Sequence, residues 1–506
     1  MDEYTPNLNN VITNDMFGRL DIYASFDDIT PDNIVDELNS ALVYHVQNLM
    51  QENYLYWYRR NVQPILFRHK EVRPEILNVI QENHADEIVA FKNGYFLTQP
   101  CKYISRRKGV QTKVNKLNEF LYRSGKHSAD NAVVNWFHTV GKAVMYVEPN
   151  DNDEVPFRSY ALDPRSAFVA YSLRPGNEPV MGVNFVVADE TALFDVYTKQ
   201  YVFHLKGTMV GKMLTTQKNQ DFIASASELV SVEPNVLGMI PIIEYRYNEI
   251  NTSAFELVLP LLDAINNIQS NRVDGVEQFI QSLAVAVNCN FDDGVTANEI
   301  RKAGMIVLKS VGENKADFRI LSEQLDQQQT QTLVDYLYSQ VQRICAMPIV
   351  DRQGRTYDST GSAALVTSGW YQADAAARNT EDLFKRSNRY FDEIIVSILK
   401  RKGLLDISLN DFELNFTRNE TSNVQSKAQA FQTLMSAGFN PELAAAKSGI
   451  SNDPVADMKM SEPYLKMIWG DPTKVDQVER QTDGQGEARI VESDNDNGED
   501  QIGGAV

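Results

Sequence analysis

The sequence contains little cysteine and no long apolar run. Its 506 residues include three cysteines, Cys101, Cys289 and Cys345, which are widely separated and form no CxxC pair. This pattern argues against a disulfide framework or a zinc knuckle. No apolar stretch approaches the ~20 residues that cross a bilayer, and the acidic, polar start MDEYTPNLNN is not typical of a signal peptide. We therefore expect a soluble protein of the reducing cytoplasm that does not associate with a membrane.

Sequence signatures of common enzymes are also missing. The string nearest to a phosphate-binding loop, residues 207–213, is one residue short and ends in Met213, where the loop needs a hydroxyl side chain. The six histidines show neither HxxxH nor HExxH spacing, and no GxSxG nucleophile elbow is present. We predict no catalytic residues, no cofactor and no bound metal.

Two carboxylate clusters keep one enzymatic alternative open. Asp151, Asp153 and Glu154 form the first cluster, and Asp292 and Asp293 form the second. Both fall between expected strands, where aspartate is favoured simply because it suits turns. A metal-dependent nuclease that uses one of these clusters remains the alternative from a different functional class.

Acidic residues outnumber basic ones over the chain as a whole, and one segment is an exception. The formal net charge is −20 and the pI is near 4.8, which excludes a strongly basic protein whose affinity rests on neutralising phosphates. Residues 101–126 are the exception, with eight basic residues and one acidic residue, a net charge of +7. Two interpretations stay open for this segment, a nucleic-acid contact and a solvated face that meets an acidic neighbouring subunit.

The periodicity of apolar residues predicts an α+β chain. Helices are expected from Thr30 or Asp32, which could cap the first of them, then from about Glu75, and over residues 85–97. Between about 143 and 250 the period becomes two, which predicts an antiparallel sheet unit. The expected strands are 143–147, 157–162, 167–171, 182–187, 193–197, 201–205 and 241–246.

A helix is expected over residues 261–283, entered through Pro260. One side is apolar, and the other carries carboxylates, amides and a hydroxyl but no lysine or arginine. Taken alone, this polar stripe indicates the solvated face of a surface helix. Its members are Asp263, Asn267, Ser270, Asp274, Glu277 and Gln281.

Beyond this helix the chain returns to β character before two further helices. Residues 285–325 predict short strands around a helical turn at 296–303, and a helix follows over about 326–345. Residues 351–361 have loop composition, and a very long helix is expected from Ser362 to about Lys402. Short helices are then expected between 421 and 466. The acidic tail, residues 471–506, is expected to be disordered.

Two strings, in this order, resemble the portal (head-to-tail connector) proteins of tailed bacteriophages with long non-contractile tails. The first runs from Gly238 to Asn266 through the sequence GMIPIIEYRYNE, and continues to Phe279. The second begins at Met347-Pro348 with DRQG soon after, and continues through TGSAAL to EDLFKRS, which ends at Ser387. The resemblance spans about residues 40–465. Residues 351–360 are shorter than in some members of the family.

The resemblance implies an α+β portal-like subunit with several domains. It assigns an antiparallel β wing to residues 1–250 with the long helix 362–402, and stem helices to 251–284 and 326–350. It assigns a small α/β clip to 285–325, a tunnel loop to 351–361 and a helical crown to 403–470. The expected tunnel-loop residues are Asp351, Arg352, Arg355, Tyr357, Thr360 and Gly361.

The family's biology supplies the expected function. Such a chain forms a ring, in this family of twelve copies, at one capsid vertex of the virion, assembled in the host cytoplasm. The ring conducts double-stranded DNA during packaging and ejection. The implied partners are the terminase large subunit, major capsid and scaffolding proteins, a head-completion or tail adaptor, and DNA held transiently and non-specifically. The polar stripe at 263–281 would then line the channel. Another non-enzymatic head protein, scaffold or minor, is the second alternative.

Overall fold

The structure is a computed structural model of the chain. The chain divides into two compact units, Met1–Asn423 and Val424–Val506. Each unit is considered by itself. The mixture of helices and sheets confirms the predicted α+β class. The described residues are 18–71, 74–97, 99–107, 109–210, 223–280, 283–287, 289–290, 309–310, 317–321, 327–349, 369–416, 424–451 and 454–469.

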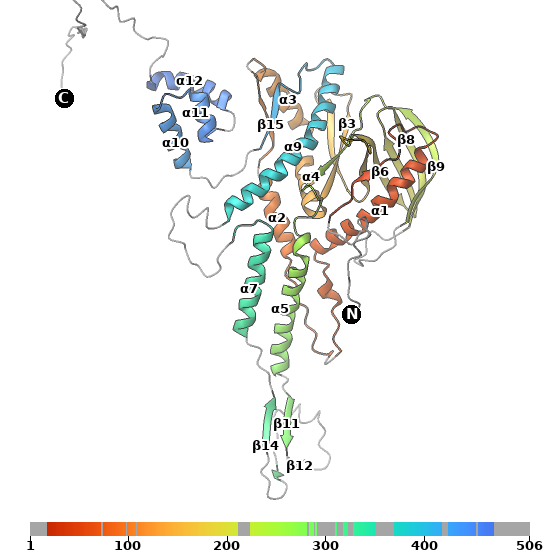
Figure 1. Ribbon diagram of the computed structural model, residues 1–506, viewed down its shortest axis with the longest axis vertical. Coiled ribbons are helices and arrows are strands. Elements are labelled where there is room, and N and C mark those ends of the chain that lie inside the picture. The colour runs from red at the N-terminus through yellow and green to blue at the C-terminus, as the bar shows by residue number, and fades with distance from the viewer. Residues whose placement is uncertain are drawn as a thin grey trace, which may run out of the picture. The chain divides into compact units, whose positions relative to one another are not determined.

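A six-stranded sheet covered by a long helix forms one part of the first unit (Figure 1). The helix α1 (Ile34–Arg59) buries apolar residues at three- and four-residue steps against this sheet. Asn33 occupies its N-cap position, so the predicted caps Thr30 and Asp32 are wrong by one to three residues. The strand order is β1 (Ile22–Tyr23), β5 (Ala167–Tyr171), β6 (Pro179–Ala188), β7 (Thr191–Tyr197), β8 (Tyr201–Val210) and β9 (Ile223–Pro234).

The strands expected between 143 and 250 divide between two sheets. The smaller sheet is antiparallel, in the order β10 (Ile242–Arg246), β3 (Lys142–Pro149), β4 (Phe157–Leu162). The helices α4 (Lys126–Val140) and α9 (Trp370–Arg401) share its core. Gly141 ends α4 with a φ of +95°, and a Cβ there would lie 2.1 Å from the Asn251 carbonyl oxygen. Only glycine therefore allows this close approach.

The helices differ from what the sequence predicts in three places. The residues after Glu75 form no helix, because 76–83 are extended. The long helix α9 begins at Trp370 after Gly369, which has a φ of +81°, and the start expected at Ser362 lies outside the described residues. The helices α3 (Gln111–Arg123) and α4 were not predicted as separate elements. The expected helix over 85–97 is confirmed as α2 (His84–Phe96).

One strand falls within residues 403–470, the range expected for the crown. The strand β15 (Phe412–Asn415) pairs with β2 (Lys102–Ser105), about 300 residues earlier in the chain, and so belongs to the first unit. The second unit contains α10 (Val424–Ser436), α11 (Pro441–Ser448) and α12 (Pro454–Trp469). The tail expected to be disordered lies outside the described residues.

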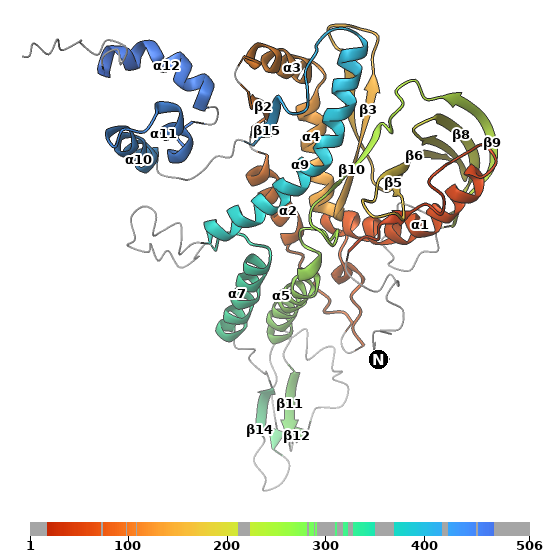
Figure 2. The same cartoon turned by 45° about the horizontal axis from the view of Figure 1, so that its top comes forward.

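The helices α5 (Leu259–Ile280) and α7 (Gln327–Ile344) confirm the two helices expected on either side of residues 285–325. They lie side by side (Figure 2). Beyond α5, β11 (Leu283–Val287) pairs with β14 (Asp317–Leu321), and β12 (Cys289–Asn290) pairs with β13 (Lys309–Ser310). The helical turn expected at 296–303 lies outside the described residues.

Candidate functional site

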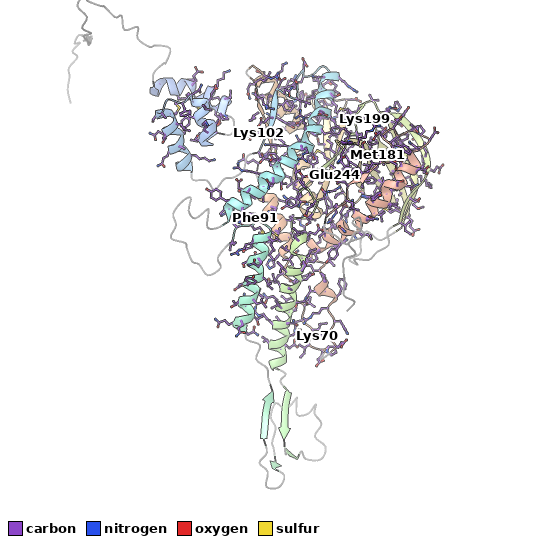
Figure 3. All side chains as sticks on the ribbon, in the orientation of Figure 1. Lys70, Phe91, Lys102, Met181, Lys199 and Glu244 are labelled. Atoms are coloured by element: carbon purple, nitrogen blue, oxygen red, sulfur yellow. The ribbon has the colours of Figure 1, made fainter. Side chains whose placement is uncertain are left out.

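The described residues between α1 and α2, 61–71 and 74–82, run along α5, and we call them the strap. It begins with the short 3-10 helix η1 (Pro64–Phe67) and returns as an extended chain. Figure 3 labels Lys70 in this region, beside the lower part of α5. The strap therefore covers a face of α5 that its sequence pattern alone assigns to solvent.

The extended limb of the strap is bound by side chains of α5 spaced four residues apart. The backbone N–H groups of Asn78, Ile80 and Glu82 donate hydrogen bonds to this row of acceptors. Two extended residues advance about 6.6 Å and four helical residues about 6.0 Å, so the two repeats match. The acceptors are Asp274 Oδ1 at 2.8 Å, Ser270 Oγ at 2.9 Å and Asn266 Oδ1 at 2.8 Å.

Asp274 carries the charge of this contact. Its carboxylate lies 2.5 Å from Lys70 Nζ and 3.0 Å from Arg68 Nη2, and the side chain of Asn78 donates to it as well. Burial would raise the pKa of Asp274, but the hydrogen bonds from Lys70 and Asn78 and the charge of Arg68 hold it below its ordinary value. The group is therefore a paired anion at neutral pH.

The structure changes the interpretation of the polar stripe. Ser270 is 0% and Asp274 3% exposed, and the strap covers both. Side chains this buried within one subunit cannot line a solvent-filled channel, so the channel-lining role expected for these two residues does not fit. The sequence shows that a helix face is polar, but not whether water or the chain's own backbone satisfies it.

The remaining members of the stripe are placed as follows. Asp263 accepts a hydrogen bond of 2.8 Å from the Tyr58 hydroxyl, and Glu277 accepts one of 2.7 Å from the Asn78 side chain. Asn267 is exposed. Gln281 lies outside the described residues. The stripe therefore acts largely as an attachment face for residues 58–82.

A different face of α5 packs against α7. Ile265 on α5 and Val334 and Val341 on α7 are buried in one core. Arg272 extends this contact, because its guanidinium donates to the side chains of Gln331 at 2.7 Å and Gln327 at 3.1 Å. The helix α5 is thus held on one side by α7 and on another by the strap.

Met347 and Gly369, which lie before and after the expected tunnel loop in the chain, are close together. A Cβ at Gly369 would lie 3.6 Å from the Met347 carbonyl oxygen. Trp370, the first residue of α9, packs against the rings of Phe91 and Tyr95 on α2. The described residues on either side of 350–368 therefore lie close together. The predicted loop residues Asp351, Arg352, Arg355, Tyr357, Thr360 and Gly361 lie outside the described residues.

Much of the basic segment is engaged within its own subunit. Lys126 is buried, pairs with Asp130 and lies 4.4 Å from the centre of the Phe391 ring. Other members of the segment contact residues 404–413. Lys113 and Lys116 donate to the Asp406 and Leu404 carbonyls, and Arg107 and Arg106 pair with Asp411 and Glu413. These contacts favour an internal docking role over a nucleic-acid contact.

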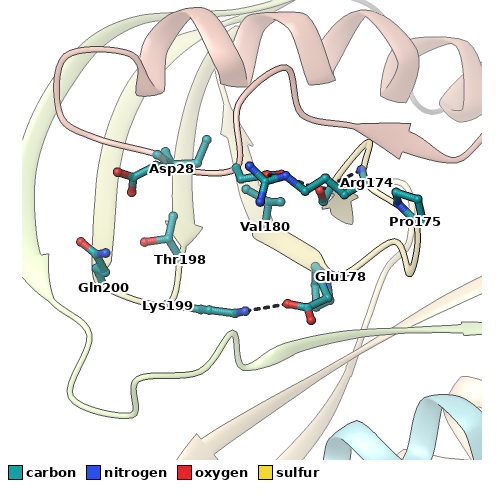
Figure 4. A pocket seen from close by; sticks show the side chains of 12 residues that line it. Asp28, Arg174, Pro175, Glu178, Val180, Thr198, Lys199 and Gln200 are labelled. Atoms are coloured by element: carbon teal, nitrogen blue, oxygen red, sulfur yellow. Dashed lines mark hydrogen bonds and ion pairs between the residues drawn. The ribbon is translucent and has the colours of Figure 1, made fainter.

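A hollow near the edge of the larger sheet shows no catalytic arrangement. This cavity of about 340 Å³ is lined by several charged side chains. Lys199 pairs with Glu178 at 3.1 Å, as Figure 4 shows, and Arg174 pairs with Asp27 at 2.6 Å. Over the described residues, no group of three or more histidine, cysteine or acidic side chains is placed to hold a metal. Asp153, from a candidate cluster, pairs with Lys402.

Comparison with known families decides the identity of the chain. The family model for phage portal proteins, SPP1 Gp6-like, matches residues 45–462. The chain belongs to this portal protein family. The resemblance found in the sequence is therefore confirmed over most of its length. No match is found among the curated proteins that were compared with the chain.

Membership gives the coarse biology of this portal-family chain. Portal proteins are bacteriophage virion components of the capsid vertex, associated with genome packaging and oligomeric assembly, and the family is generally structural rather than catalytic. No helix in the described part of the chain is long and apolar enough to cross a membrane.

Proposed function

We propose that the chain forms a closed ring, of twelve copies as in its family, through which double-stranded DNA enters and leaves the capsid. The terminase large subunit docks on the ring during packaging, and a head-completion or tail adaptor replaces it later. Major capsid and scaffolding proteins surround it. The family match over residues 45–462 carries this proposal.

The proposed domains follow the expected order with one change. Residues up to 250 and α9 form the wing, α5 and α7 the stem, and the strands between them the clip. The crown is limited to the helices after residue 423, because β15 pairs within the first unit. The clip is the first contact for the terminase.

Weak contact with DNA follows from the charge of the chain. A net charge of −20 repels the duplex, so sliding meets few strong phosphate contacts. The buried members of the α5 stripe, Ser270 and Asp274, do not contribute to this repulsion of DNA. The arginines of the tunnel loop supply the local exception, since a guanidinium can pair transiently with a phosphate.

Ring formation is the first expected outcome. Sedimentation of the purified chain should show one large species far above the 57.2 kDa subunit, with a central hole by negative-stain imaging. A chain ending at residue 470 should assemble equally well, because the acidic tail has little apolar surface to bury. Monomer alone across a wide range of salt and concentration would contradict the proposal.

The tunnel loop gives a second expected outcome. Arg352→Ala combined with Arg355→Ala should leave rings and empty heads intact but lower the yield of DNA-filled particles, because two phosphate contacts per subunit are lost. Lysine at both positions is the matched control and should retain part of the yield, since the charge remains. Normal yields of filled, infectious particles from the alanine variant would contradict a role for these arginines in contacting DNA.

Imaging and a cleavage assay separate the two alternatives. A scaffold or minor head protein would show no ring with a central hole. A nuclease would cut DNA with a divalent cation and lose that activity on mutation of Asp292 and Asp293. We expect rings and no cleavage.

A further inference from the structure

The two limbs of the strap lie side by side and run in opposite directions. Arg68 Nη1 donates to the Asn78 carbonyl at 3.1 Å, and Lys70 Nζ donates to the Ile76 carbonyl at 3.1 Å. Both contacts run from a long side chain of one limb to a backbone carbonyl of the other. The strap is therefore a narrow two-limbed layer on α5.

The inner and outer sides of this layer differ in chemistry. The inner side carries Arg68, Lys70 and Asn78, which bind Asp274 on α5. The exposed side chains of the strap include large apolar ones, of which Phe67 is 67% exposed, beside polar ones such as His69 and Glu75. We call the exposed residues Leu66, Phe67, Leu77 and Val79 the strap patch.

The helix α7 carries a second open apolar surface. Tyr336 is 59% exposed, and Leu333 and Ile344 are also exposed. At 100° per residue these three lie within an arc of about 80°, whose centre is about a quarter turn around the helix from Val334 and Val341, which pack in the core. We call Leu333, Tyr336 and Ile344 the α7 patch. Exposed apolar groups gathered in this way mark an interaction surface.

A single copy cannot join its own two patches. Figures 1 and 2 both show α5 between α7 and the strap. The contacts of Arg272 with α7 and of Asp274 with the strap agree, because they leave α5 on different faces. When two different patches lie on separate sides of one subunit, each patch can be covered by the other patch of a neighbouring copy. Such head-to-tail contacts close into a ring when the rotation between neighbouring copies divides a full turn evenly.

We propose that the strap patch of one copy docks on the α7 patch of the next copy. The inference rests on the proposed ring and deepens it by naming the two surfaces that meet. Phe67 and Tyr336 are the central side chains, since large aromatic residues dominate such contacts. The occupant is a second copy, because one chain carries both apolar surfaces and α5 separates them.

Two variants test the contact by complementation. Phe67→Asp with Leu77→Asp disables the strap patch, and Leu333→Asp with Tyr336→Asp disables the α7 patch. Each variant alone should sediment at the subunit mass, with the single contact weakened about 30-fold or more. An equimolar mixture should give dimers and no rings, because each pair retains one intact contact.

Control variants distinguish failure of the proposed contact from misfolding and from failure of ring formation itself. Leu173→Asp with Val236→Asp changes two other exposed apolar residues and should leave rings unchanged. Circular dichroism and thermal unfolding should show each variant folded; for a variant that does not fold, cysteines at Phe67 and Tyr336 in one chain should instead give a ladder of oxidised multimers. Rings from either aspartate variant, or dimers from one variant alone, would overturn the head-to-tail contact. Absence of rings in the unmodified chain would instead overturn the proposed function.

Discussion

Asp274→Asn is expected to release the strap from α5. The change removes the charge that pairs with Lys70 and Arg68 and leaves both cations without their partner. Breaking a largely buried pair costs about 3 kcal/mol. Hydrogen exchange at the Asn78 and Ile80 amides should therefore become about 100-fold faster, because these N–H groups are protected by the strap contact.

The control and the pH dependence make this prediction specific. Glu277→Gln keeps an acceptor for the Asn78 side chain and should change exchange little. The lowered pKa of Asp274 means that its stabilisation is present above its ordinary value and is lost as pH falls through the lowered pKa, below about 4. Asp274→Asn should abolish that acid-dependent loss. Unchanged exchange at Asn78 would show that the pairing does not hold the strap.

Asp392→Asn is expected to stabilise the first unit at neutral pH. Burial raises the pKa of Asp392 to about 7, although the hydrogen bond from Tyr103 and the charge of Lys126 lower it. The unfolded chain releases this proton near pH 4 and the folded chain only near pH 7, so stability falls between these values. Asparagine still accepts from Tyr103 without this cost, a gain on the order of 3 kcal/mol.

Thermal unfolding at several pH values tests this prediction. The unmodified chain should lose stability between pH 4 and pH 7, and Asp392→Asn should show a flatter profile. Asp382→Asn, on the exposed side of the same helix, is the matched control and should follow the unmodified chain. A lower melting temperature for Asp392→Asn at pH 7 would mean that the carboxylate is needed in its charged form.

Much of the secondary structure was predictable because it is encoded locally. The strands β4 and β5 were expected at their observed bounds, and α2 and α7 within one residue. Each has apolar residues at its own period of two or about four, and that period does not depend on distant partners. The absence of catalytic motifs was likewise visible in the sequence.

The partners of polar groups could not be predicted from local pattern. The sequence pattern after Glu75 predicts a helix. In the structure this segment is extended, because its backbone N–H groups donate to side chains of α5 that lie almost 200 residues further along the chain. For the basic segment the sequence leaves open a nucleic-acid contact or a solvated face that meets an acidic neighbouring subunit, and the structure adds contacts of Lys113 and Lys116 with residues 404–413 of the same chain. Both cases have one cause, since the local sequence around a polar group does not specify its hydrogen-bonding partner.

The sequence by itself determined the α+β class, the family and the order of the long helices, because these rest on periodicity and on strings read along the chain. Only the tertiary structure decided that Ser270 and Asp274 bind the strap, and that the strap and α7 leave apolar surfaces on separate sides of α5. Those outcomes depend on which segments meet in space. Contacts of that kind arise from the whole fold, where backbone groups far apart in sequence satisfy one another.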